Sequence, residues 1–228
     1  MKRLVWLLIV VVALIGCQKK HPVRVYVDPA MTPDAVEQVA VFSFTSLIHQ
    51  ADDPDGQAPR MLEEYFMPEL DKRNDYKFIA PNSVAYAIQS EDLEERTKKF
   101  LNDWPISKQA DSELLSKLAQ RLNCDAFLIP VVDLWQKDEA DYQENTTPAT
   151  YVGATITIVS ADNGTVLFEA SDEDYIEGAR TETDDRSIVR GGSGRVAADY
   201  SAKLYRAPPF DGVVQKVVAA LALSLPAR

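Results

Sequence analysis

The stretch Asn123–Glu169 constrains the fold most, because it predicts three strands of one sheet. Asp125–Asp133 is an apolar run with the length and composition of a buried strand. A polar loop follows, and two further apolar runs, Thr150–Val159 and Thr165–Glu169, then flank Ala161–Gly164. Asn-Gly between two apolar runs predicts a β-hairpin with a type I′ turn, because that turn needs positive φ at both central residues. We therefore expect these strands to organise the sheet.

Helices and further strands are predicted on both sides of this stretch. Strands are expected at Gln38–Phe44 and Tyr76–Ala80, and Val23–Val27 is expected to be a strand or an extended arm, because its apolar residues alternate. The apolar stripes at helical spacing predict helices at Pro59–Arg73, Pro81–Ile88, Glu91–Asn102, Asp111–Leu122 and Phe210–Leu225. Within them, Pro68 should bend the first helix, and Asp111 or Ser112 should cap the fourth. For the charged helix, we expect a solvated surface with i,i+4 pairs from Glu94 and Glu95 to Lys98 and Lys99.

These elements predict one α/β domain: a mixed β-sheet with a hairpin at about 150–169 and flanking helices. The domain is expected at 38–228, after a tether or arm at 17–37. Residues 171–195 are polar, acidic and glycine-bearing, so they are expected to form a long loop. The apolar residues of Arg195–Tyr205 fit both the spacing of a helix and the alternation of a strand. The alanine content favours a helix, and a strand remains the alternative.

The first sixteen residues have the pattern of a targeting segment. Lys2 and Arg3 precede the apolar run Leu4–Ile15, which is too short to span a bilayer and fits a signal peptide. The run ends in Leu14-Ile15-Gly16-Cys17, which resembles the lipobox of bacterial lipoproteins. The resemblance implies that residues 1–16 are removed and that Cys17 carries fatty acyl chains such as palmitate, which serve as a membrane anchor. Gln18, rather than Asp, follows the cysteine, which by the same resemblance implies the periplasmic face of the outer membrane.

Charge excludes one class of partner. Loss of Lys2 and Arg3 with the signal would change the formal net charge from −11 to −13. Nucleic-acid binding depends largely on Lys and Arg at phosphates, so we expect no nucleic-acid partner.

Motifs for catalysis, metals or cofactors are weak. The two histidines, His21 and His49, have no second His or Cys at ligand spacing, so no metal site is predicted. Ala51–Gly56 resembles a calcium loop, but Ala51 and Leu62 stand where an EF-hand needs Asp and Glu, and a solvated turn is the better interpretation. No phosphate loop, dinucleotide fingerprint or nucleophile elbow occurs, and no cofactor or enzyme activity is predicted.

The remaining cysteine and the glycine-rich stretch are expected to have structural roles, and a group of charged residues is expected to bind a partner. If Cys17 is lipidated, Cys124 is left alone and is expected to be a small buried residue. The glycines between Arg190 and Arg195 favour a linker over an anion site. The residues expected to form a partner surface are Asp172, Glu173, Asp174, Arg190 and Arg195.

The region Gln38–Ala170 resembles a group of bacterial outer-membrane lipoproteins. The resemblance lies in Val39–Phe44, Tyr76–Pro81, Leu114–Ala119 running into Cys124–Val132, and the hairpin Thr155–Ala170. The group includes the curli-secretion channel lipoprotein and the activator lipoproteins of penicillin-binding proteins. It implies an α/β fold and a non-enzymatic, lipid-anchored accessory or scaffold protein of the cell envelope that binds an envelope protein. The alternative is a subunit of an oligomeric secretion channel of the curli type, so homo-oligomerisation stays open.

Overall fold

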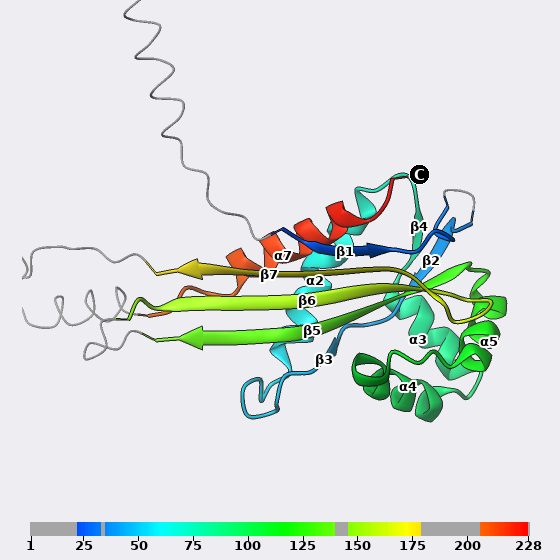
Figure 1. Ribbon diagram of the computed structural model, residues 1–228. Helices are drawn as coiled ribbons and strands as arrows, with labels where there is room; N and C mark the ends of the chain where they lie inside the picture. The colour runs from blue at the N-terminus through cyan, green and yellow to red at the C-terminus, as the bar shows by residue number, and fades with distance from the viewer. Residues whose placement is uncertain (1–21, 33–34, 140–145, 179–205, 228) are drawn as a thin grey trace, which may run out of the picture.

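A computed structural model describes residues 22–32, 35–139, 146–178 and 206–227. In these residues the chain forms one α/β domain with a seven-stranded, open, mixed sheet and helices on both faces (Figure 1). The strands are β1 Arg24–Val27, β2 Gln38–Val41, β3 Thr45–Ser46, β4 Lys77–Ile79, β5 Ala126–Asp138, β6 Ala149–Ser160 and β7 Val166–Glu177. The helices are α2 Gln57–Asp71, α3 Pro81–Ser90, α4 Glu94–Ser107, α5 Ser112–Leu122 and α7 Asp211–Ser224.

The sheet combines a parallel part with an antiparallel part. Its order is β1-β7-β6-β5-β2-β4, and β3 pairs with β5 beside β2. β2 is parallel to β4 and β5, whereas β5, β6 and β7 form an antiparallel meander. The predicted mixed sheet with flanking helices is confirmed. β1 lies antiparallel on β7, so the segment expected to be a tether or arm contributes an edge strand.

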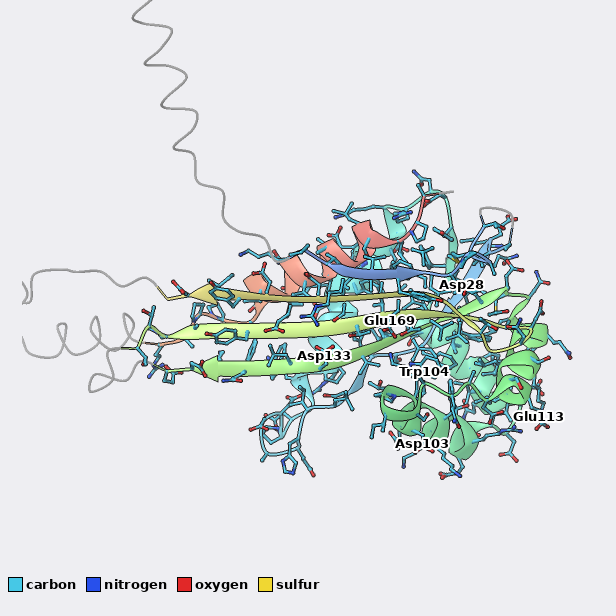
Figure 2. The ribbon with its side chains drawn as sticks, in the orientation of Figure 1. Asp28, Asp103, Trp104, Glu113, Asp133 and Glu169 are labelled. Atoms are coloured by element: carbon cyan, nitrogen blue, oxygen red, sulfur yellow. The ribbon has the colours of Figure 1, made fainter. Side chains whose placement is uncertain are left out.

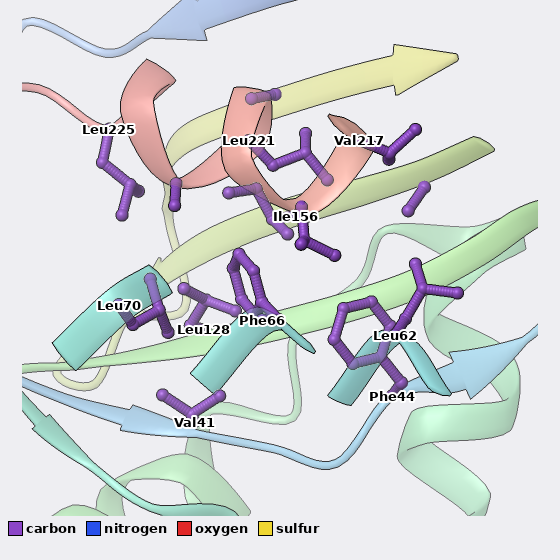
Figure 3. Close-up of a cluster of buried hydrophobic side chains, with 14 of the residues drawn as sticks. Val41, Phe44, Leu62, Phe66, Leu70, Leu128, Ile156, Val217, Leu221 and Leu225 are labelled. Atoms are coloured by element: carbon purple, nitrogen blue, oxygen red, sulfur yellow. The ribbon is translucent and has the colours of Figure 1, made fainter. Parts of the chain in front are cut away.

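Two apolar cores lie on the two faces of the sheet. The α2 and α7 helices cover one face, which we call the covered face. Figure 3 shows Leu62, Phe66 and Leu70 of α2 beside Val217 and Leu221 of α7 and residues of the sheet. All five of these side chains are fully buried, and each contributes about 1.5–3 kcal/mol through burial. The opposite face packs against α3, α4 and α5 through a second core that includes Phe42, Phe100, Trp104, Leu115, Leu118 and Phe127.

The hairpin is present, but its turn is not the predicted type I′. Gly164 has φ of 73°, whereas Asn163 is not among the residues with positive φ. Instead, the Asn163 side chain accepts a hydrogen bond from the Thr165 N–H at 2.9 Å, and Ser160 pairs with Thr165 across the loop. The loop is longer than the two-residue connection of a type I′ hairpin. The Asn163 side chain can therefore hydrogen-bond the backbone, and Gly164 is the loop residue that adopts the left-handed conformation.

Two of the three long strands, β5 and β7, extend into segments that were predicted to be loops. β5 continues to Asp138, past the predicted end at Asp133. β7 continues to Glu177, so the loop predicted at 171–195 is wrong over Ser171–Glu177. Acidic residues at successive positions of β7 argued against a strand, but Asp172 is buried and Asp174 faces Lys216 of α7 at 3.9 Å. Residues 179–205 lie outside the described part of the chain. They include Arg195–Tyr205, for which the sequence favours a helix over a strand.

The helices agree with prediction apart from their ends and two details. The α2 helix runs through Pro68 from Gln57 to Asp71, and Asp111 caps α5 by accepting from the Leu114 N–H. The expected ion pairs of Glu94 and Glu95 with Lys98 and Lys99 do not form. Instead, Arg96 contacts Asp111 at 2.7 Å and Glu113 at 2.9 Å. These contacts hold α4 against the start of α5, and the guanidinium holds the pKa of the Asp111 carboxyl below its usual range.

Candidate functional site

The antiparallel meander reaches beyond the helices that cover one of its faces. β5 has 13 residues, and β6 and β7 have 12 each. Figure 1 shows α3, α4 and α5 gathered at one end of the sheet, while β5, β6 and β7 project past them with α7 behind. On the face that bears α3–α5, the projecting part therefore has no helix over it in the described structure. We call this surface the open face.

A β-bulge places Asp133 on the open face. The register between β5 and β6 shifts between Val132 and Leu134: Leu134 stands opposite Gly153, and Asp133 is the extra residue of the bulge. A Cβ on Gly153 would lie 2.6 Å from Asp133 Oδ1 and 2.9 Å from Leu134 Cβ. Glycine at this position therefore makes room for the carboxylate against the sheet. The Thr155 hydroxyl donates to Asp133 Oδ2 at 2.7 Å and orients it.

A polar cleft of about 440 Å³ lies where the open face meets the end of α4. Lys108 ends α4 with φ of 51°, and its ammonium contacts Glu169 Oε2 at 2.5 Å. The Thr157 hydroxyl donates to the same carboxylate at 3.3 Å. Figure 2 shows Asp133 and Glu169 on the meander and Trp104 on α4. The polar groups of the cleft come from Arg24, Tyr26, Lys108, Asp133, Thr155, Glu169 and Ser171, and the rest of the lining from Val25, Leu47, Pro105 and Val131.

Two titratable groups that line the cleft have raised pKa values, Tyr26 and Asp133. The Tyr26 hydroxyl donates a hydrogen bond to Asp28 at 3.0 Å, and this contact raises the pKa of Tyr26. Asp133 is an exposed residue, yet the neighbouring sheet atoms displace enough water from its carboxylate to raise its pKa. Donation from Thr155 lowers the pKa of Asp133 again, while Glu173 raises it and Lys108 lowers it. Burial and a neighbouring carboxylate thus oppose ionisation, and a hydrogen bond and an ammonium favour it.

Farther along the open face, Tyr151 of β6 and Tyr175 of β7 form a stacked pair. They are partners in the strand register, with ring centroids 5.5 Å apart and an interplanar angle of 27°. The carboxylates of Asp138, Glu173 and Glu177 surround the pair on the same side of the meander. We call these five residues the tyrosine patch; the polar cleft and the tyrosine patch together make up the candidate site.

A larger hollow of about 590 Å³ lies between the loop 47–57 and β5. It includes Asp53 of the sequence that resembles a calcium loop, together with Trp135 and Phe210. Asp53 accepts hydrogen bonds from the N–H groups of Gln57 at 2.7 Å and Ala58 at 2.9 Å. Its carboxylate therefore stabilises the start of α2, as a helix-capping group does. This hollow has a structural explanation, and we do not assign it as the functional site.

Of the five residues that the sequence grouped into one partner surface, the structure describes three, and these three do not share one surface. Glu173 lies on the open face, whereas Asp172 is buried with 7% of its surface exposed and Asp174 faces α7. Arg190 and Arg195 lie outside the described residues, and so does Cys17. Cys124 is buried; burial raises the pKa of its thiol to about 12, and the nearby Asp125 contributes to this rise.

Sequence reasoning missed Lys108, Asp133, Tyr151, Glu169 and Tyr175 as site residues. One signal for the bulge was present, because an isolated glycine inside a strand, here Gly153, often marks a bulge or a close approach. The facing of Tyr151 and Tyr175 depends on strand register, and the pairing of Lys108 with Glu169 spans 61 residues. No local pattern predicts such contacts.

The described residues contain neither a membrane-spanning helix nor a cluster of metal ligands. Among the helices of the described ranges, none is both long and apolar enough to cross a bilayer. The same ranges contain no group of three or more His, Cys, Asp or Glu side chains placed to hold a metal ion.

Comparison with known proteins gives structural relatives only. No protein-family model matches the sequence, and no curated protein matches it. The chain is similar to the PelC dodecamer from Paraburkholderia phytofirmans, with 15% identity, 90% of this chain and 97% of that chain covered, and a TM-score of 0.38. It is similar to lipoprotein GNA1162 from Neisseria meningitidis, with 12% identity, coverage of 73% and 93%, and a TM-score of 0.40. For the C-terminal domain of LpoB from Escherichia coli, the identity is 10%, the coverage 61% and 83%, and the TM-score 0.33.

The similar structures thus include a lipoprotein and the C-terminal domain of LpoB. They do not show the predicted resemblance to the curli-secretion lipoprotein. Similarity at this level assigns neither a family nor a function to the chain, so its function is argued from its own residues.

Proposed function

We propose that this protein is a lipid-anchored accessory protein of the cell envelope, without enzymatic activity, that binds an envelope protein through the open face. The open face is the observation that carries this proposal. An antiparallel sheet can leave one face to solvent, so the absence of a helix is not itself a sign of binding. The open face has more than that: a bulge and a glycine that seat Asp133, a cleft, and a stacked tyrosine pair.

The exposed tyrosine of the open face, Tyr175, supports a role in protein binding. Tyr175 keeps 40% of its surface exposed although it is a large aromatic residue on a strand. Tyrosine is enriched in protein interfaces because it offers a large apolar ring and a polar hydroxyl at low entropic cost. The polar cleft beside the patch adds groups of both charges, which suit hydrogen bonds at the rim of an interface.

The lipid anchor is the part of the proposal that rests on sequence. The lipobox-like Leu14–Cys17 predicts acylation of Cys17, and Gln18 predicts the periplasmic face of the outer membrane. Two or more acyl chains anchor a protein stably without a membrane-spanning helix. Substitution Cys17→Ser should therefore abolish labelling with radioactive palmitate and release the protein from the membrane fraction.

Site-specific photo-cross-linking tests the binding surface. A photoreactive residue replaces Thr155 or Tyr175 on the open face of the full-length lipidated protein, and Leu223, which is 79% exposed on α7, serves as the control position. We expect one discrete adduct with a different protein from the open-face positions and none from Leu223. Equal adducts at all three positions, or no adduct at Thr155 and Tyr175, would contradict the proposal.

Particle mass in mild detergent separates the proposal from its alternative. We expect the lipidated protein without its partner to be a monomer or a dimer. A ring of many copies, together with adducts only between identical chains, would instead support the secretion-channel alternative.

A further inference from the structure

The tyrosine patch carries carboxylates that no cation of the described chain neutralises. Asp138, Glu173 and Glu177 form no ion pair in the described residues, and Asp138 only accepts a hydrogen bond from the Gln136 side chain at 2.6 Å. The patch is therefore a π surface surrounded by negative charge. Burial raises the pKa of Tyr151, and Asp138, Tyr175 and Glu177 raise it further, which agrees with this arrangement.

Two described arginines lie near the patch but form no ion pair with it: Arg24 stands opposite Ser171 on the open face, and the backbone of Arg206 lies beside Gly178. The lysines of the region face other groups. Lys137 of β5 stands over the ring of Phe210, with its nitrogen 4.5 Å from the centroid, and Phe210 stacks on Trp135 of the covered-face core. Lys216 of α7 faces Asp174 at 3.9 Å. At the near end of the open face, Lys108 is engaged with Glu169. On the covered face, Lys216 thus pairs with Asp174, whereas no described cation pairs with the three carboxylates of the tyrosine patch.

The negative charge and the aromatic surface of the tyrosine patch together indicate which chemical group it binds. A guanidinium is planar, stacks on an aromatic face and donates two parallel hydrogen bonds to one carboxylate. Tyr151 and Tyr175 supply the aromatic face, and Glu173 and Glu177 flank Tyr175 at i−2 and i+2 on the same side of β7. A strand-like segment repeats its side chains on one side every second residue, as the patch does.

We propose that the tyrosine patch binds a basic, arginine-bearing segment of the partner protein. This inference rests on the proposed function and adds the chemistry of the partner. The partner's arginines stack on Tyr151 and Tyr175 and pair with Glu173, Glu177 and Asp138. An ammonium gains the charge attraction but not the bidentate pairing, so arginine is preferred over lysine.

Peptide binding to the full-length lipidated protein in mild detergent tests this directly. The probe is a fluorescein-labelled peptide in which arginine and serine alternate, measured by fluorescence anisotropy at low ionic strength. The double substitution Glu173→Gln and Glu177→Gln keeps side-chain shape and removes two charges. We expect it to weaken binding about fivefold to tenfold, the size of one to two exposed charge contacts. The matched control, Glu94→Gln with Glu95→Gln on exposed positions of α4, should bind as the unmodified protein does.

A second variant tests the aromatic contribution. Tyr175→Ala should weaken the arginine peptide about threefold or more and reduce the preference for it over a lysine–serine peptide, because stacking is lost. A citrulline–serine peptide, which keeps the planar group but lacks charge, should bind poorly. Equal binding by the Glu173/Glu177 variant, or equal binding of the citrulline peptide, would overturn the inference.

The two proposals fail in different ways. If open-face positions cross-link a partner and the Glu173/Glu177 variant cross-links it equally well, the binding face stands and the arginine inference is wrong. If the open face gives no adduct while the arginine peptide binds only through Glu173 and Glu177, the patch chemistry stands and the proposed partner function is wrong.

Discussion

The two faces of β5, β6 and β7 are formed by the same strands but carry opposite kinds of surface. On the covered face, Phe168 is fully buried and Trp135 stacks on Phe210 with ring centroids 3.6 Å apart. On the open face, Tyr175 is 40% exposed, and Asp133 occupies a bulge. The comparison shows that the covered face stabilises the meander, while the open face can carry charged and aromatic groups at little cost to folding.

The largest expected difference in the free energy of unfolding is between two alanine substitutions on opposite faces of β7. Phe168→Ala on the covered face of β7 should lower the free energy of unfolding by about 3–5 kcal/mol, through lost burial and a cavity. Tyr175→Ala on the open face of the same strand should lower it by less than about 1.5 kcal/mol, the size of one aromatic pair. Urea unfolding of both variants measures the difference. Similar losses would show that the open face is packed in solution.

Replacing a glycine by alanine should have a smaller effect on stability, and it should differ between Gly153 on the open face and Gly212 in α7, which packs on the covered face. Gly153→Ala should lower the free energy of unfolding by about 1–3 kcal/mol, because its Cβ would overlap Asp133 and Leu134. Adding Asp133→Ala removes the nearest atom and should restore part of the loss. Gly212→Ala in α7 is the control: its Cβ would meet only the end of Ile176, at 3.1 Å, in a helix that favours alanine. An equal loss for both glycines, measured by thermal unfolding, would contradict the special role of Gly153.

Charge removal on the two faces should have small effects of opposite sign. Because the folded pKa of Asp133 is raised, its ionisation disfavours folding. This penalty is absent below the unfolded pKa of about 3.9 and grows as the pH rises through the folded pKa. Asp133→Asn should therefore raise stability at pH 7 by less than about 1 kcal/mol, since solvent screens an exposed charge, and should have little effect near pH 3.

Asp174→Asn on the covered face is the counterpart of that change. It removes the attraction to Lys216, so it should lower stability slightly at pH 7. Urea unfolding at both pH values measures the two effects. Destabilisation by Asp133→Asn at pH 7 would show that the hydrogen bond from Thr155 outweighs the burial of the charge.

Much of the fold could be predicted from the sequence, because the hydrophobic pattern is local. Leu114, Leu115 and Leu118 recur at helical spacing, and all three are fully buried in α5. The apolar run after Cys124 became the central strand β5 with apolar residues on both faces. The end of β7 was missed because Asp172 and Asp174 break the alternation that identifies a half-buried strand. Asp172 is buried, and Asp174 faces Lys216 of α7, a helix that begins more than 30 residues later.

The sequence by itself determined the α/β class, the order of the main elements, the expected lipid attachment at Cys17 and the acidic character of the chain. These follow from composition and from patterns that repeat within a few residues. Only the tertiary structure decided which polar residues share a surface. The bulge at Asp133, the register that pairs Tyr151 with Tyr175, and the reach of Lys108 to Glu169 each depend on how distant segments pack. The open face arises because β5, β6 and β7 extend past α3, α4 and α5, and the relative extent of packed elements is not encoded in any local stretch of the chain.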